Sequence, residues 1–284
     1  MTPPKNLRVE KVTLYRRRSV WYHGVGGTLR HVLILLTGMV LVAAEWAAST
    51  ALGAVGTGVA STAAEPPATT KPMDYYALST EDFFKRPELD QKIAAKAFNL
   101  TLLEAAVFHQ TNRERANNKL PLFKYGSAMN LMARLHSQEM ADLQYFEHDS
   151  PVPANKTMGD RLKNAGLVNV TAGENIAVLP AKEMGSGHYV THPGAGNDVW
   201  FDEVSGKRVD YYTYRAIAQD VVTQWMNSPA HHANIVEKRF VYLGIGVARG
   251  PYEDQKQDSF YFTQNFCATI TAGSEEKAKG KLGT

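Results

Sequence analysis

The chain has 284 residues, 44% of them hydrophobic and 21% charged, which is ordinary for a soluble globular protein and leaves room for one well-buried core. Its formal net charge is +3, but seven Lys and Arg residues lie ahead of the first apolar run, so the rest of the chain is close to neutral. This distribution provides no basic face and excludes nucleic acid as the expected partner. The single cysteine, Cys267, excludes an internal disulfide and is expected to be a small core residue.

Residues 1–64 are interpreted as a signal peptide or an N-terminal membrane anchor. A basic leader, the apolar run HVLILLTGMVLVAA and a tail rich in Ala, Ser and Thr are typical of a secretory signal, with cleavage near Ala63 or Ala64. The alternative is an uncleaved anchor with membrane contact, since the stretch up to Ala60 is long enough to span a bilayer. Glu45 and the many Gly and Thr residues favour cleavage. With either outcome the domain is exported, to the medium or the cell envelope.

Residues 65–97 open with the linker sequence EPPATTKP, and the remainder is interpreted as an accessory segment with a short helix near Thr80. The domain proper is assigned to residues 98–271. Its first helix is expected from Thr101, where TLLE forms a capping box with Glu104, to about Arg115.

Three further helices are expected from apolar spacing and caps. They run from Ser127 to about Leu143, from about Met158 to Ala165, and from Thr213 to the Ser228–Pro229 stop. Strands are expected at residues 174–178, 241–249 and 260–270, the last two as a hairpin. This order predicts an α+β domain with helices layered on a small antiparallel sheet. Residues 272–284 lack apolar content and are expected to be a disordered tail.

Three motifs bring imidazoles and a carboxylate onto loops: YFEH ending at His148, GENIA with Glu174, and WMNSPAHHANI with His231 and His232. Imidazoles on converging loops bind zinc, with the glutamate positioning a water molecule or acting as a base. Without metal, a glutamate beside two histidines transfers protons. A third alternative, of equal weight for Glu174, is a buried carboxylate that braces the backbone.

Together with HQTNRERANNKLPLFKYGSAMNLMARLHSQEM, LGIGVA and YFTQNF, these motifs occur in an order that resembles the CAP superfamily of cysteine-rich secretory, antigen 5 and pathogenesis-related proteins. The resemblance covers roughly residues 100–270 and is to the disulfide-free bacterial branch of SCP domains. It implies a three-layer α/β/α sandwich around a three-stranded antiparallel sheet. It also implies a surface cleft whose candidate catalytic residues are His148, Glu174 and His231.

The chain departs from the family pattern at two positions. Ser228 stands three residues after Trp225, where eukaryotic members carry a second glutamate, and His232 stands where bacterial relatives usually have arginine. Two histidines and one carboxylate make a thin metal site, so at most a weakly bound zinc ion on His148 and His231 is expected. Ser228 and His232 are assigned a supporting role.

Neighbouring residues are expected to support the cleft or the core. Asn175 and Asn234 are expected to brace loops through their amides, Trp225 to lie in the core, and His136 to pack with a hydrogen bond. An insertion, residues 180–212, adds His188, His192, Asp202 and Glu203; it either covers the cleft or decorates the surface.

Two functional hypotheses follow. The preferred one is an exported binding or interaction module for a lipid, a cell-envelope component or another protein, which rests on the incomplete cleft and on the family's association with sterol and lipid binding. The alternative is a zinc-assisted, peptidase-like hydrolase that uses His148, His231 and Glu174. The sequence has neither a G-x-S-x-G elbow nor an H-E-x-x-H helix.

Overall fold

The computed structural model describes residues 15–16, 74–93, 98–184, 188–191, 199–252 and 257–282. Within these ranges no helix is both long enough and apolar enough to cross a bilayer. The apolar run of the leader, the expected cleavage site and His192 lie outside the described residues.

The described chain alternates helices with a few strands. The helices are α1 (Thr80–Phe84), α2 (Leu100–Asn117), α3 (Ser127–Leu143), α4 (Met158–Asn164), α5 (Tyr214–Met226), α6 (Pro229–Val236) and α7 (Ala272–Leu282), with 3-10 turns η1 (Tyr75–Ala77), η2 (Pro87–Asp90) and η3 (Pro153–Asn155). The strands are β1 (Tyr15–Arg16), β2 (Lys124–Tyr125), β3 (Ala172–Pro180), β4 (His188–Thr191), β5 (Trp200–Asp202), β6 (Tyr242–Tyr252) and β7 (Gln257–Cys267).

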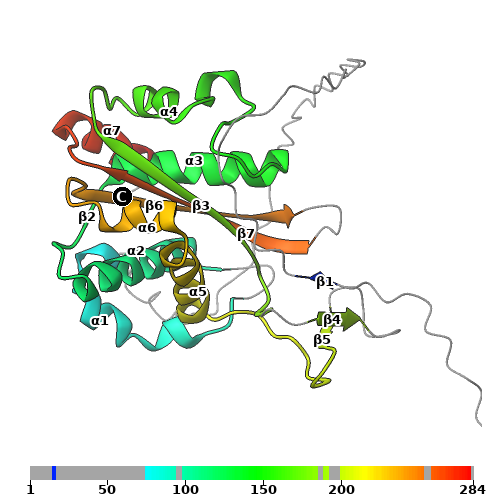
Figure 1. Cartoon of the computed structure of the whole chain (residues 1–284). Coiled ribbons are helices and arrows are strands. Elements are labelled where there is room, and N and C mark those ends of the chain that lie inside the picture. Colours follow the sequence, from blue (N-terminus) through cyan, green and yellow to red (C-terminus); the bar gives the residue numbers. More distant parts are fainter. Residues whose placement is uncertain are drawn as a thin grey trace, which may run out of the picture. The chain divides into compact units, whose positions relative to one another are not determined.

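The main sheet has the strand order β2-β6-β7-β3. β6 and β7 form the expected antiparallel hairpin and β3 pairs antiparallel with β7, so the predicted three-stranded core of the sheet is confirmed. β2 adds a parallel strand of two residues, which is too short to leave a periodic pattern in the sequence. Helices α3, α4 and α7 cover one face and α2, α5 and α6 the other (Figure 1), which gives the three-layer α/β/α sandwich of the α+β class.

Strand β7 shows why both faces need a helical layer. Phe260, Phe262 and Phe266 pack into the core beneath α2 and α5, while Tyr261 and Cys267 pack on the α3 side. This alternation follows from the two-residue period of a strand, and it makes both faces of the strand apolar. Cys267 is fully buried, and burial raises the pKa of its thiol to about 12, so it is the core residue that was expected.

The glycines of the LGIGVA motif allow α3 to lie directly on β6. A Cβ atom on Gly244 would lie 2.1 Å from the backbone of Asn130, and one on Gly246 would lie 2.1 Å from the backbone of Ala133. No side chain fits in that space, so the layer that carries His136 is held at the closest possible approach to the sheet.

The first two helices differ from prediction at their caps. The side chain of Asn99, not Thr101, caps α2, and Glu104 is buried against Arg134 on α3 instead of closing a capping box. α3 begins at Ser127 as predicted, but Glu275 supplies the cap by accepting from the Ser127 amide at 3.0 Å. The partners of Glu104 and Ser127 were not predicted because they are far away in sequence.

Two segments assigned outside the core belong to it. Phe83, Leu89 and Ile93 of the expected accessory segment are fully buried in the main hydrophobic cluster. The expected disordered tail forms α7, where Ala278 is buried against the α3 side of the core. Helix α6 was not predicted either; Pro229 ends α5 and at the same time occupies the first turn of α6, where its missing N–H costs nothing.

The 180–212 insertion folds partly on itself. Its strands β4 and β5 pair with each other and, through β4, with β1. Met184, Tyr189 and Val209 form a small buried cluster with Trp200 packed against it. Asp202 accepts hydrogen bonds from the amide and hydroxyl of Ser205 at 2.6 and 2.7 Å, so this carboxylate is used within a turn of the insertion.

Candidate functional site

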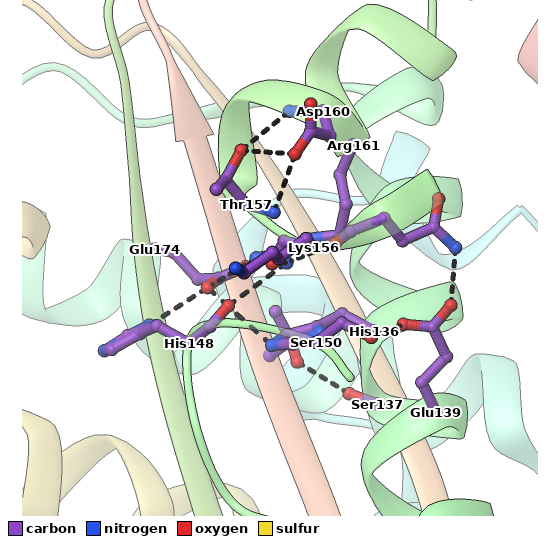
Figure 2. Close-up of polar contacts among 12 residues, drawn as sticks. His136, Ser137, Glu139, His148, Ser150, Lys156, Thr157, Asp160, Arg161 and Glu174 are labelled. Carbon is purple, nitrogen blue, oxygen red and sulfur yellow. Dashed lines mark hydrogen bonds and ion pairs between the residues drawn. The ribbon is translucent and has the colours of Figure 1, made fainter. Parts of the chain in front are cut away.

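The site lies where the open edge of the sheet meets the loop between α3 and α4. β3 is an edge strand, and its residue Glu174 points towards α3 and α4 (Figure 2). The next residue, Asn175, points to the opposite layer, as the two-residue period of a strand requires. His148 is on the α3–α4 loop, beside Glu174, so two motifs that are 26 residues apart meet as predicted.

Glu174 is the centre of the polar cluster. Its Oε1 atom lies 3.0 Å from Nδ1 of His148, and Nη2 of Arg161 lies 2.9 and 2.8 Å from the two carboxylate oxygens. With its amide oriented to satisfy both neighbours, Asn265 donates to Oε2 at 3.1 Å and accepts from the Ala133 amide. Both oxygens of Glu174 therefore have hydrogen-bond donors.

Arg161 also holds the loop that carries His148. Its Nη1 atom donates to the carbonyl oxygens of His148 and Asn155 at 3.1 Å each. From α3, Glu139 accepts from the Ser150 hydroxyl at 2.7 Å and from the side-chain amide of Asn155, which fixes the other side of the same loop. The site is thus built on a loop that helices α3 and α4 clamp from two sides.

His136 is a fully buried member of the cluster. It projects from α3, its Nε2 atom lies 3.8 Å from Oε1 of Glu174 without a hydrogen bond, and its Nδ1 atom lies 3.4 Å from the Tyr145 hydroxyl. Burial lowers the pKa of His136 to about 4, against the opposing charge of Glu174. The expected packing role with a hydrogen bond agrees with this position, but the approach to Glu174 was not expected.

The carboxylate of Glu174 is held in its ionised form. Burial by itself raises its pKa, but the hydrogen bond from His148 and the permanent positive charge of Arg161 contribute in the opposite direction, and the pKa is lowered. A buried carboxylate that stays ionised and accepts hydrogen bonds from every side has little capacity to take up another proton.

The third motif contributes from the opposite layer, around the same sheet edge. Asn175 donates to the carbonyl oxygen of His231 at 3.2 Å, and Asn234 donates to the carbonyl oxygen of Glu174 at 3.2 Å and to Asn175 Oδ1 at 2.8 Å. These bonds confirm the expected bracing role of both amides. His231 on α6 is half-buried, and its pKa is lowered by burial and, to a smaller extent, by the charge of His148.

The remaining predicted residues serve the framework of α5 and α6. Trp225 is buried, as expected, and its indole N–H donates to the carbonyl of Ile176 at 3.1 Å. Ser228 is buried at the N-terminal cap position of α6, where its carbonyl accepts from the amide of His232 at 2.8 Å. His232 is half-buried on the same helix.

The donor set does not fit a zinc ion. Among the described ranges, no group of three or more His, Cys, Asp and Glu side chains is arranged to hold a metal. Glu174 already has donors on both oxygens, which leaves the Nε2 atom of His148 and the His231 imidazole, fewer protein ligands than the three or four of a typical zinc site. We therefore derive no chemical step through a metal ion.

Sequence reasoning missed Arg161. It lies in the polar helix α4, where MGDRLKN gives no sign that one cation is buried. The available signal was indirect: a buried glutamate requires a positive partner, and few Lys and Arg residues lie between the two motifs.

A comparison with protein families identifies the class of protein that this fold and site define. A model of the cysteine-rich secretory protein family, CAP, matches residues 108–266, more than half of the chain. The chain belongs to this family, as a CAP/SCP-domain protein of the bacterial type.

Two curated relatives come from Bacillus subtilis (strain 168). The uncharacterized protein YkwD is 28% identical over 148 residues, which are 52% of this chain and 43% of that protein. The uncharacterized membrane protein YlbC is 25% identical over 166 residues, which are 58% of this chain and 34% of that protein. The match thus spans less than half the length of either relative.

Two solved structures are also similar to part of the chain. An extracellular SCP-domain protein from Bacillus anthracis str. Ames is 29% identical, with a TM-score of 0.38 over 59% of this chain and 40% of that one. An outer surface protein from Borrelia burgdorferi is 14% identical, with a TM-score of 0.38 over 64% of this chain and 99% of that one.

Proposed function

We propose that this chain is an exported binding module that recognises a cell-envelope component through the site around His148 and Glu174. The observation that carries the proposal is the state of Glu174, whose two oxygens are occupied by Arg161, His148 and Asn265. A general base needs a free lone pair and a pKa near the working pH, and Glu174 has neither. The basic leader and apolar run of residues 1–64 support export.

The exposed part of the site is suited to recognition. The His148 side chain is 55% exposed, although its loop is fixed by Arg161 and Glu139. A polar side chain on a rigid support loses little conformational entropy when a ligand binds, so its hydrogen bond contributes more of its strength to affinity.

Cosedimentation of the purified protein with insoluble cell-wall material tests the proposal. We expect the wild-type protein to sediment with the walls and His148→Ala to bind at least about tenfold more weakly, the loss of roughly 1.4 kcal/mol typical of one important contact. His232→Ala is the matched control, since this half-buried imidazole lies beside His231 and is expected to bind walls like the wild type. Equal binding by His148→Ala and the wild type contradicts the proposal.

The same samples separate the alternatives. Binding to phospholipid vesicles in place of cell walls would identify a lipid ligand. Release of soluble fragments from the walls, lost in Glu174→Gln, would instead favour the hydrolase. The saturated hydrogen bonding of Glu174 argues against that outcome.

A further inference from the structure

We propose that Arg161 is a positioning residue that fixes the tautomer of His148, with the proton on Nδ1 and the lone pair of Nε2 directed outwards. The inference concerns the state of the histidine and holds whichever ligand the module binds.

The ionisation state of Glu174 decides which nitrogen of His148 carries the proton. An ionised carboxylate only accepts hydrogen bonds. Oε1 lies 3.0 Å from Nδ1 of His148 and 2.9 Å from Nη2 of Arg161, while Oε2 lies 2.8 Å from the same Nη2 atom. Because the guanidinium is always charged, the carboxylate beside it stays ionised and Nδ1 of His148 has to be the donor.

Arg161 contacts both members of the Glu174–His148 pair. Its Nη2 atom holds the side chain of Glu174, and its Nη1 atom holds the backbone carbonyl of His148 at 3.1 Å. The Arg161 side chain is only 2% exposed, so water does not compete for these bonds. One planar group therefore sets the distance between the histidine and its carboxylate.

His136 is the other histidine near Glu174. His136 also faces Oε1 of Glu174, but at 3.8 Å and without a hydrogen bond. It does not take the place of His148 on the carboxylate. The ring of His148 is the exposed one, and the fixed proton on Nδ1 leaves Nε2 as an acceptor for the ligand. An organic ligand that hydrogen-bonds to Nε2 therefore has to donate, as a hydroxyl does.

The tautomer can be read directly by long-range ¹H–¹⁵N correlation spectra of the ¹⁵N-labelled protein, at a pH where the imidazoles are neutral. The signals of His148 are assigned among the nine histidines by their loss in His148→Gln. We expect Nδ1 of the wild type to be the N–H nitrogen and Nε2 the bare one. A solvent-exposed histidine side chain carries its proton mainly on Nε2, so that pattern in the wild type would overturn the proposal.

Two variants test the part played by Arg161. In Arg161→Gln the buried carboxylate loses its permanent cation, and protonated Glu174 then donates to Nδ1, so the Nδ1–H form should fall to a minority. Arg161→Lys restores the charge without the planar fork and should recover part of the Nδ1–H population. An unchanged tautomer in a folded Arg161→Gln protein contradicts the assignment.

The matched control is Arg134→Gln, which breaks the second buried Arg–Glu pair and should leave the His148 signals as they are. If Arg161→Gln does not fold, the test rests on the wild-type spectrum and on Arg161→Lys, whose tautomer can be read without the Gln variant. A partial loss of the Nδ1–H form is expected in Arg161→Lys, and a fully retained Nδ1–H form would contradict the part assigned to the planar guanidinium. A failure to find any ligand leaves these results standing, so the inference and the proposed function fail separately.

Discussion

Glu104 and Glu174 are both buried glutamates that accept two hydrogen bonds from an arginine side chain, and they behave in opposite ways. Glu104 joins α2 to Arg134 of α3, at 2.7 and 2.6 Å. Burial outweighs that partner, and the pKa of Glu104 is raised. Glu174 is almost as buried, but its pKa is lowered, because it accepts a hydrogen bond from His148 in addition to those from the charged Arg161.

The difference shows what turns a structural ion pair into a site. The Glu104 pair has only framework neighbours, and its arginine side chain is 25% exposed. In the Glu174 pair the arginine side chain is only 2% exposed. Glu174 also has a third partner, His148, whose side chain is exposed at the surface. The same two residue types thus stabilise a helix contact in one place and prepare an exposed imidazole in the other.

The largest expected effect comes from removing the buried arginine of the site. Arg161→Met removes the cation of buried Glu174, which then remains charged without a partner or takes up a proton at a cost in free energy, and breaking a buried pair in this way costs about 3–5 kcal/mol. Arg134→Met should cost roughly half as much, because water reaches that pair and Glu104 takes up a proton more readily. Urea denaturation of both variants measures the two losses; equal losses would remove the distinction between the pairs.

The next effect is a pH dependence that belongs to the Glu174 region. The pKa of His136 is about 4 when folded, against 6.5 for an unperturbed histidine. The unfolded chain therefore takes up the proton first as the pH falls, and stability that is complete above about pH 6.5 is lost towards pH 4, by about 3 kcal/mol from this residue.

His136→Gln should remove that share of the acid sensitivity. The unfolding free energy is measured at about pH 7 and pH 4 for the variant and the wild type. Carboxylates titrate in both proteins, so their contribution to the change with pH cancels when the two changes are subtracted. Glu104→Gln serves as the contrast. The pKa of the Glu104 carboxylate is raised on folding, so its contribution to the unfolding free energy grows as the pH falls, opposite to that of His136. An unchanged slope in His136→Gln would show that this imidazole is not buried neutral.

A smaller effect is expected at Glu275, whose carboxylate accepts from the amide at the start of α3. Glu275→Ala removes the cap that α7 supplies to α3 through the Ser127 amide, and loss of such a cap costs about 1 kcal/mol. Differential scanning calorimetry should show a lower melting temperature. A melting temperature equal to that of the wild type would return residues 272–284 to the disordered tail that their composition predicts.

The smallest effect is expected at an exposed pair. The hydrogen bond from Arg239 lowers the pKa of Glu237 to about 2, but this carboxylate is open to water and ions. Glu237→Gln should leave the unfolding transition unchanged within error, because exposed ion pairs contribute little. A clear loss of unfolding free energy in Glu237→Gln would mean that burial does not explain the difference between the Glu104–Arg134 and Glu174–Arg161 pairs.

The sequence alone predicted much of the framework and part of the site. Helices α3, α4 and α5 and the three long strands follow from local apolar spacing and caps, which act within a few residues. The order of the motifs indicated the CAP superfamily and placed His148 beside Glu174. The bracing roles of Asn175 and Asn234 were predicted as well.

Only the tertiary structure decided which charges are buried and what they bind. Arg161 reads as a surface residue of a polar helix, Glu104 as a capping residue and Glu275 as part of a loose tail, yet each meets a partner brought close by the packing of layers on the sheet. Local patterns fix helices and strands because those interactions are short in sequence. The partner of a buried charge is set by which side chains meet once the core closes, and that is why the clamp on His148 and Glu174 was visible only in three dimensions.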